Sequence, residues 1–173
     1  TLHGQGTAKF KNFLYKGNIN FGILDSRIYP LHGTQYTESE SEITFNDGTI
    51  YKGTIHNNVI DGKGTFTFPT GSTYDGEVKN GLRDGYGVYT CSKKKISYEG
   101  EWKAGMKHGK GKLIKPTMIY EGDWNNGVIN GYGKIRWVES NNYYCGDIKK
   151  ALLDGNGYLI WNGVNEKYCG QWK

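Results

Sequence analysis

One short pattern recurs along the chain and constrains its fold more than any other feature. A tyrosine is followed by glycine two residues later, by Trp, Ile or Val at four, and by glycines at eleven and thirteen. A period of about 20–50 residues is the signature of an array assembled from one small unit. Successive tyrosines are 22 to 24 residues apart, and the units begin at Tyr51, Tyr74, Tyr98, Tyr120, Tyr144 and Tyr168.

The repeat divides the chain into a row of units with one irregular member. The irregular unit, 15–50, begins normally at Tyr15 but has Ser26 where the next glycine should fall, followed by a polar insert over 27–40. Because the chain begins and ends inside a unit, we expect it to be a segment of a longer array. The predicted organisation is a partial unit 1–14, the irregular unit 15–50, regular units from 51, 74, 98, 120 and 144, and a partial unit 168–173.

Each unit is predicted to form a β-hairpin. Tyr98, Gly100 and Trp102 alternate with acidic residues, so they lie on one face of a strand. Glycine weakens a strand unless something approaches its backbone closely. We therefore expect the large rings of neighbouring strands to lie over the glycines. Stacked hairpins of this kind predict an all-β fold, an elongated single-layer twisted antiparallel sheet.

The composition fits a thin sheet. Hydrophobic residues make up only 36% of the chain, but aromatic residues reach 14%, so stacked rings can replace an aliphatic core. The net charge of +5 arises from charges of both signs spread along the sequence, which disfavours a nucleic-acid partner. Three cysteines without a C-x-x-C motif predict free thiols. Without a long apolar run or a signal peptide, we expect a soluble intracellular protein.

The repeated motif resembles a known family. The stretch YEGEW at 98–102, continued by Gly105, His108-Gly109 and Gly111, is similar to the MORN repeat (membrane occupation and recognition nexus). The resemblance covers nearly the whole chain, and the main departure is 27–50. Longer runs such as 71–78, 120–124 and 135–137 are similar to MORN proteins of the radial spokes of motile cilia. This implies a cytoskeletal scaffold in the axoneme of a cilium or flagellum, with other spoke subunits as partners.

No catalytic, metal or cofactor site is predicted. The Gly-x-Gly pairs lack the spacing of a phosphate-binding loop and recur in every unit, so we interpret them as packing glycines. The acids near each unit start should face solvent and pair with lysines of neighbouring strands. Histidines at equivalent positions several repeats apart cannot converge on a metal. We therefore expect a non-enzymatic protein without a cofactor.

The aromatic face is predicted to be mainly core, with partly exposed rings that also form a docking surface. An amphipathic helix or an extended segment of a partner protein fits such a surface. The insert 27–40 is either a partner-specific contact or a disordered loop. The candidate docking residues are Tyr74, Tyr98, Trp102, Tyr120, Trp124, Trp137, Tyr144 and Trp161.

Two alternatives remain open at the level of sequence. Three consecutive lysines, Lys93, Lys94 and Lys95, are candidates for contact with anionic lipid, which would make the chain a phosphoinositide-binding membrane module. The other alternative is a regulatory MORN segment attached to a larger enzyme.

Overall fold

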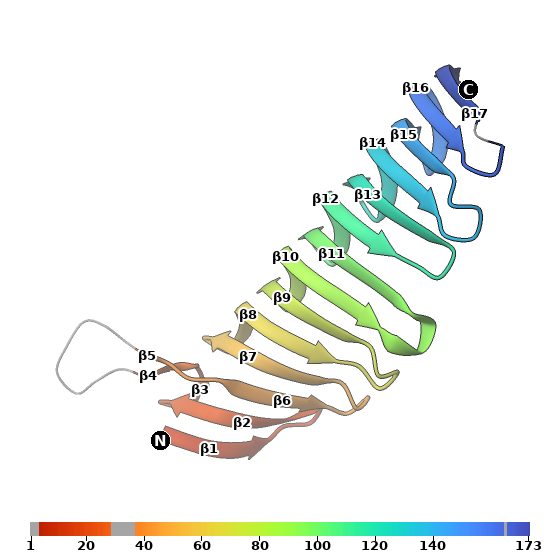
Figure 1. Cartoon of the computed structure of the whole chain (residues 1–173). Helices are drawn as coiled ribbons and strands as arrows, with labels where there is room; N and C mark the ends of the chain where they lie inside the picture. Colours follow the sequence, from red (N-terminus) through yellow and green to blue (C-terminus); the bar gives the residue numbers. More distant parts are fainter. Residues whose placement is uncertain (1–3, 29–36, 165) are drawn as a thin grey trace. The chain divides into compact units, whose positions relative to one another are not determined.

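The fold is all-β and consists of paired hairpins. The computed structural model describes residues 4–28, 37–164 and 166–173, and it divides into two compact units, Thr1–Gly85 and Tyr86–Lys173. In the described ranges, fifteen strands form one open antiparallel sheet in which strands that follow each other in sequence are mostly neighbours (Figure 1). The sheet of stacked hairpins predicted from the repeat is thereby confirmed.

The strands of the first unit are β1 (Gly4–Lys9), β2 (Phe13–Asn20), β3 (Ile23–Leu24), β4 (Arg27–Ile28), β5 (Thr37–Glu38), β6 (Ser41–Phe45), β7 (Ile50–His56), β8 (Val59–Thr67) and β9 (Thr73–Lys79). The boundary between the units falls within β10 (Leu82–Cys91). The elements of the second unit are the 3₁₀ turn η1 (Ser92–Lys94), β11 (Ile96–Lys103), β12 (Met106–Ile114), β13 (Met118–Asn125), β14 (Val128–Trp137), β15 (Tyr143–Lys149), β16 (Leu152–Trp161) and β17 (Glu166–Trp172).

Two-residue turns close the regular hairpins. Asn80 and Gly81 join β9 to β10 with φ angles of 51° and 76°, and Lys150 and Ala151 join β15 to β16 with φ angles of 50° and 65°. Positive φ at both central residues is the type I′ geometry, whose twist matches that of the flanking strands. All such turns lie along one side of the sheet, where one set of strand ends meets, and we call this side the turn edge. The longer links between hairpins join the opposite ends of the strands, along the side that we call the link edge.

The core is a row of tyrosine rings lying on glycine backbone. A Cβ atom added at Gly64, Gly111 or Gly133 would approach the ring of the tyrosine that begins the same unit to less than 3.0 Å. The tyrosine hydroxyl then donates a hydrogen bond to the carbonyl three residues further on, for example from Tyr98 to Glu101 O at 2.9 Å. The predicted packing of rings over glycines is confirmed.

In the hairpins that begin at Tyr51, Tyr98, Tyr120 and Tyr144, a β-bulge lies at the residue three positions after the tyrosine. In the hairpin that begins at Tyr98, the register of the β11–β12 pair shifts between Gly100 and Trp102. There Glu101 Oε1 accepts the backbone N–H of Lys110 at 2.7 Å. Asp123 and Asp147 accept the N–H groups of Tyr132 and Asn156 at 2.8 Å in the same way. The acids at this position therefore have a structural role that the sequence analysis missed.

The irregular unit keeps the hairpin and interrupts its second strand. Ser26 Oγ accepts the N–H of Ile55 at 2.8 Å, and Ser26 N–H donates to Ile55 O at 2.6 Å, so Ser26 occupies the place of the missing glycine. The sheet resumes at Ser41, whose Oγ lies 3.1 Å from the hydroxyl of Tyr15. The predicted insert 27–40 lies between these two residues, and its part 29–36 lies outside the described residues.

Candidate functional site

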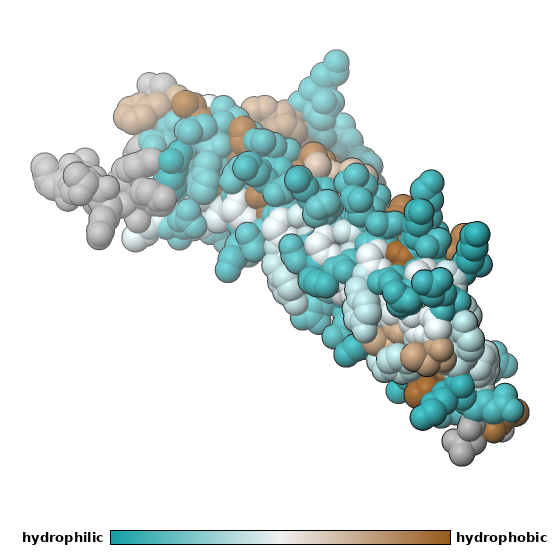
Figure 2. Space-filling view, turned by 90° about the horizontal axis from the view of Figure 1, so that it is seen from above, coloured by the Kyte–Doolittle hydropathy of each residue, from teal (hydrophilic) through white to brown (hydrophobic). Residues whose placement is uncertain are grey.

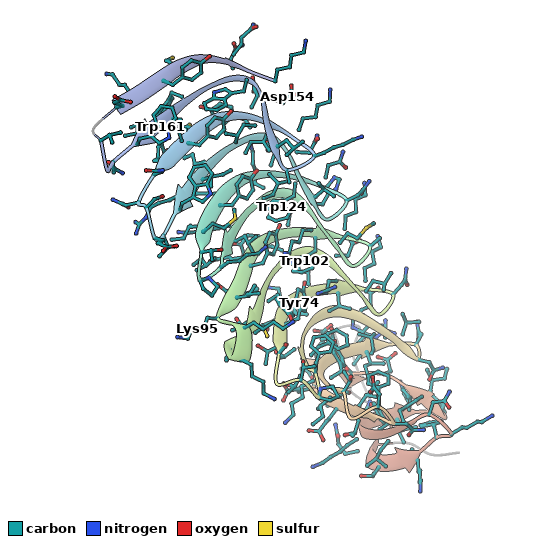
Figure 3. The ribbon with its side chains drawn as sticks, turned by 90° about the vertical axis from the view of Figure 1, so that its right-hand side faces the viewer. Tyr74, Lys95, Trp102, Trp124, Asp154 and Trp161 are labelled. Carbon is teal, nitrogen blue, oxygen red and sulfur yellow. The ribbon has the colours of Figure 1, made fainter. Side chains whose placement is uncertain are left out.

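The structure places most of the predicted docking residues in the core. Tyr74, Tyr98, Tyr120 and Tyr144 are 0% exposed, and Trp102 and Trp124 are 5% and 6% exposed. Figure 3 shows Trp102 and Trp124 in the middle of their hairpins. Each tryptophan lies edge-on to tyrosine rings, as for Trp124 against Tyr98 at 5.2 Å. These six side chains are covered by their neighbours and present no surface to a partner, so the predicted docking face needs this correction.

Two of the predicted docking residues, Trp137 and Trp161, are only half-buried. They end β14 and β16 at the link edge. Trp137 also lines an apolar pocket over β14. Docking of a partner stays a prediction, and its surface has to be formed by residues that the sheet leaves accessible.

Burial keeps the tyrosine hydroxyls neutral. It raises the pKa of Tyr51 and of Tyr74 to about 12, and it moves the pKa of Tyr98 and Tyr120 further in the same direction. A phenol in this state donates its hydrogen bond throughout the physiological pH range. The tyrosines are therefore structural groups and have no feature of acid–base residues.

The face opposite the tyrosines carries a groove in the second unit. It encloses about 560 Å³ and runs from the middle of β10 across β11 to β14. Its floor is the backbone of glycines in four successive strands, and its ends are formed by Tyr86 and Tyr132, which are 52% and 51% exposed. Charged side chains of both signs form the walls: Glu99, Lys110, Lys112, Glu121 and Lys134. We call this feature the glycine groove.

The polar groups of the glycine groove contact one another and side chains beside the groove. The Tyr86 hydroxyl donates to Glu99 Oε1 at 2.8 Å, and the Tyr132 hydroxyl lies 3.0 Å from the Sγ atom of Cys145. Lys110 Nζ lies 2.5 Å from Asp123 Oδ1, in agreement with the predicted pairing of acids and lysines between strands. Burial opposes ionisation of Asp123, but the hydrogen bonds from Lys110 and Tyr132 outweigh it and lower the pKa.

The groove residues occupy a sequence position that was not predicted to be functional. Tyr86, Lys110 and Tyr132 each stand between the two glycines of a Gly-x-Gly pair. The glycines were interpreted as packing residues, but the residue between them points to the other face. Alternation along a strand was the available signal, because a residue flanked by two inward glycines must face outward.

The candidate lipid-contact lysines form an exposed cluster. Lys93, Lys94 and Lys95 lie in and just after η1 at the link edge, and all three are exposed. Lys95 lies at the margin of the hairpins in Figure 3. The pair Lys149 and Lys150 lies at the turn edge of the same unit and does not extend this cluster. Figure 2 shows one face of the molecule, on which hydrophilic residues are widespread and hydrophobic residues are scattered.

The described residues contain no concentration of metal-ligating groups. Over 4–28, 37–164 and 166–173, no set of three or more His, Cys, Asp or Glu residues is arranged to hold a metal ion. Cys91, Cys145 and Cys169 are free cysteines. Within the same ranges, no helix is long and apolar enough to cross a membrane.

Sheet, core and groove together define a β-hairpin repeat protein. Four stretches of the chain, 51–73, 74–94, 98–117 and 120–141, match the MORN repeat. The chain is therefore a MORN-repeat protein. Repeats of this family are typical of non-catalytic modules.

Comparison with other proteins adds little to this assignment. No curated protein matches the sequence. A similar solved structure is the TCP domain of SAS-4 (dCPAP) in complex with a proline-rich motif of Ana2 (dSTIL) from Drosophila melanogaster. The two chains share 11% sequence identity with a TM-score of 0.43, over 77% of this chain and 84% of that chain. The place in a radial spoke stays a prediction.

Proposed function

We propose that the chain is a non-enzymatic protein-interaction module that holds a segment of a partner protein in the glycine groove. The observation that carries this proposal is the exposure of Tyr86 and Tyr132, which stand on the face where they contribute nothing to the tyrosine core. Tyrosine offers a large, rigid contact area at low cost in side-chain entropy. A floor without side chains lets a partner backbone approach closely.

The dimensions of the groove favour an extended partner segment. Tyr86 lies on β10 and Tyr132 on β14, four strands apart, which corresponds to roughly 19 Å at about 4.8 Å per strand. An extended chain of about six residues spans that distance. The alternating charges along the walls would then fix the register of the segment rather than its affinity.

We further propose that the module belongs to a scaffold of the ciliary axoneme. The support is the resemblance of several runs to the radial spoke head 10 homologue of motile cilia. On this proposal the partners are other spoke subunits, and the protein is a cytoplasmic, cytoskeletal component of the cilium or flagellum. The glycine groove would hold one of these subunits in place.

Affinity capture from solubilised axonemes tests both levels of the proposal. The wild-type chain and a Tyr86→Ala/Tyr132→Ala variant are used as baits, with Val164→Ala as a control at an exposed residue outside the groove. We expect spoke-head proteins with wild type and control, and at least a tenfold lower yield with the double variant. Equal yields from all three baits would exclude the groove, whereas no spoke protein from any bait would exclude the axonemal assignment.

Membrane binding is the second candidate, supported by the exposed cluster of Lys93, Lys94 and Lys95. Each lysine near an anionic surface contributes about 1 kcal/mol, and salt screens the attraction. Vesicles with phosphatidylinositol bisphosphate should co-sediment the wild-type chain at low salt, and a variant with all three lysines changed to glutamine should not. Binding that is absent, or unaffected by salt and by the substitutions, argues against this function. A regulatory role beside an enzyme remains an alternative without support from a described residue.

A further inference from the structure

The face that carries the tyrosine core has an open apolar pocket in the second unit. It encloses about 340 Å³ over β14, and we call it the β14 pocket. Ile135 lies at its floor, Met118 and Trp137 lie toward the link edge, and Ile148 and Leu152 lie toward the turn edge. Leu152 is 71% exposed. A cavity of about 150 Å³ already accommodates benzene, so this pocket has room for a bicyclic ring.

The repeat explains why the pocket is open. Trp124, four residues after its tyrosine, reaches back over the preceding hairpin, where its Nε1 donates to Gly111 O at 3.3 Å. Trp172 of β17 reaches in the same way over the hairpin β15–β16, with its Nε1 3.4 Å from Gly157 O and its ring 5.6 Å from that of Tyr144. The equivalent residue on β15, which would reach over the hairpin β13–β14, is Ile148. Among the described residues, no tryptophan four places after a tyrosine therefore covers β14 at this place, and the indole of Trp137 lines the pocket from β14 itself.

The floor of the pocket does not compensate for the smaller side chain of Ile148. Ile135 corresponds to Leu113 and Leu159, over whose hairpins Trp124 and Trp172 reach, and isoleucine is no larger than leucine. In the first unit, Val78 also stands where a tryptophan could be, but the equivalent floor residue there is the larger Phe66, which packs against Tyr51 at 4.8 Å. At β14 both the floor and the cover are isoleucine, which leaves the volume unfilled.

Cations stand at both ends of the β14 pocket. Lys115 lines it at the link edge, and the exposed residues Lys149 and Lys150 precede Leu152 at the turn edge. The exposed acid near the rim is Glu139, two residues after Trp137. An occupant with an apolar ring in the centre and negative charges on either side would match this arrangement.

We propose that the β14 pocket is a docking site for one tryptophan side chain in an acidic segment of a partner protein. The ring occupies the volume that the chain's own indoles fill over the neighbouring hairpins, and the flanking carboxylates face Lys115 and Lys150. The pocket lies on the opposite face from the glycine groove, so this site does not depend on the function proposed for the groove.

Fluorescein-labelled peptides provide the probe. The acidic peptide Glu-Glu-Gly-Trp-Gly-Glu-Glu is compared with a version in which alanine replaces tryptophan and with one in which lysines replace the glutamates. We expect fluorescence anisotropy at low salt to show at least tenfold tighter binding of the acidic tryptophan peptide than of either control. Equal affinity for the tryptophan and alanine peptides would overturn the proposal.

Substitutions in the protein locate the binding. Ile148→Trp restores the pattern of the repeat and fills the pocket, so it should weaken binding at least tenfold, whereas Val164→Trp adds an exposed indole elsewhere and should have no effect. If Ile148→Trp does not fold, Leu152→Glu places a negative charge at the exposed rim and should weaken the acidic peptide and strengthen the basic one. Tyr132→Ala should leave binding unchanged. A loss of affinity with Tyr132→Ala, or none with the pocket variants, contradicts the assignment.

Discussion

A phenylalanine could not replace the tyrosine that begins each unit without loss. The tyrosine ring covers a glycine of the partner strand, and the tyrosine hydroxyl donates a hydrogen bond to the carbonyl three residues further on, at 2.7 Å for Tyr74 and Tyr144. That carbonyl lies beside the β-bulge, where the regular pairing of the strands is shifted. The side chain therefore supplies apolar area and also satisfies a backbone group near the irregularity.

Replacing a core glycine measures how closely ring and backbone are packed. In Gly111→Ala, the new Cβ would lie less than 3.0 Å from the ring of Tyr98. Overpacking of this kind costs about 1–3 kcal/mol. We expect a lower midpoint in urea unfolding followed by circular dichroism and tryptophan fluorescence. Gly163→Ala, where nothing lies within 4 Å of the added atom, is the control and should change stability by less than about 0.5 kcal/mol. Similar midpoints for the two variants would contradict this account of the core.

Residue-level prediction from the sequence succeeded for the packing and failed for accessibility. The alternation of Tyr98, Gly100 and Trp102 correctly gave their common face. It could not give the covering of Trp102, which depends on the neighbouring hairpin and on a hydrogen bond from its Nε1 to Gly87 O at 3.1 Å. Nor could periodicity distinguish Ile148 from the tryptophans at the same position, because the gap it leaves depends on residues from several strands.

At the scale of the element, the hairpin accepts an insertion at one particular place. The insert of the irregular repeat unit leaves the sheet after Ser26, where regular repeat units have their bulge, and the sheet resumes at Ser41. In a regular repeat unit, a single outward-facing residue separates the two glycines that correspond to Ser26 and Ser41. An insertion there leaves the tyrosine and both flanking strands paired, as the contacts of Tyr15 show.

Asp25 fixes the start of the insert to the following hairpin. It forms an ion pair with Arg27 at 2.5 Å, and its Oδ2 accepts the N–H of Asn57 at 3.3 Å. Burial opposes ionisation of this carboxyl group, but the hydrogen bonds from Arg27 and Asn57 outweigh it and lower the pKa. The ionised form is therefore the one that stabilises the folded state.

The Asp25→Asn variant should reveal this contribution through its pH dependence. Because the pKa is lower in the folded state, the stabilisation is present above the unfolded value of about 3.9 and is lost as pH falls through the folded value. At pH 7 we expect a loss of about 1–2 kcal/mol in urea unfolding and faster hydrogen exchange of the Ile55 amide. The difference from wild type should disappear near pH 2. Glu40→Gln, an equal charge change at an exposed residue of the insert, is the control. A difference that does not depend on pH would contradict the role of the carboxylate.

Sequence reasoning at this scale located the insert but not its attachment. The loss of the Gly-x-Gly pattern after Tyr15 was enough to mark 27–40. The network around Ser26 was not visible, because it joins residues from 18 to 58 that share no periodic pattern. Contacts made outside the repeat follow from the particular fold of the insert.

At the scale of the whole molecule, stability depends on a single residue type repeated along the chain. The largest fully buried side chains of the described residues are six tyrosines, Tyr15, Tyr51, Tyr74, Tyr98, Tyr120 and Tyr144. All six have a raised pKa, with burial as the largest cause. Each ring is neutral in the folded state, and each hydroxyl proton is part of a hydrogen bond.

Alkaline pH should therefore unfold the protein in a steep transition. A tyrosine in the unfolded chain ionises near about 10, whereas Tyr51 and Tyr74 have a pKa of about 12 in the folded state. A group whose pKa is raised on folding stabilises the native state fully below the unfolded value, and this stabilisation is lost as pH rises through the folded value. Since several tyrosines act together, the free energy of unfolding falls several times more steeply with pH than it would for one group.

Absorbance at 295 nm measures this directly when it is followed together with circular dichroism. In the native protein, a large fraction of the 14 tyrosines should resist ionisation at pH 10 and then ionise together with the loss of β-structure above about pH 11. In 8 M urea all of them should ionise in one broad step near about 10. Complete ionisation near pH 10 with the circular dichroism spectrum unchanged would show that the tyrosine row is accessible, and the proposed basis of stability would be wrong.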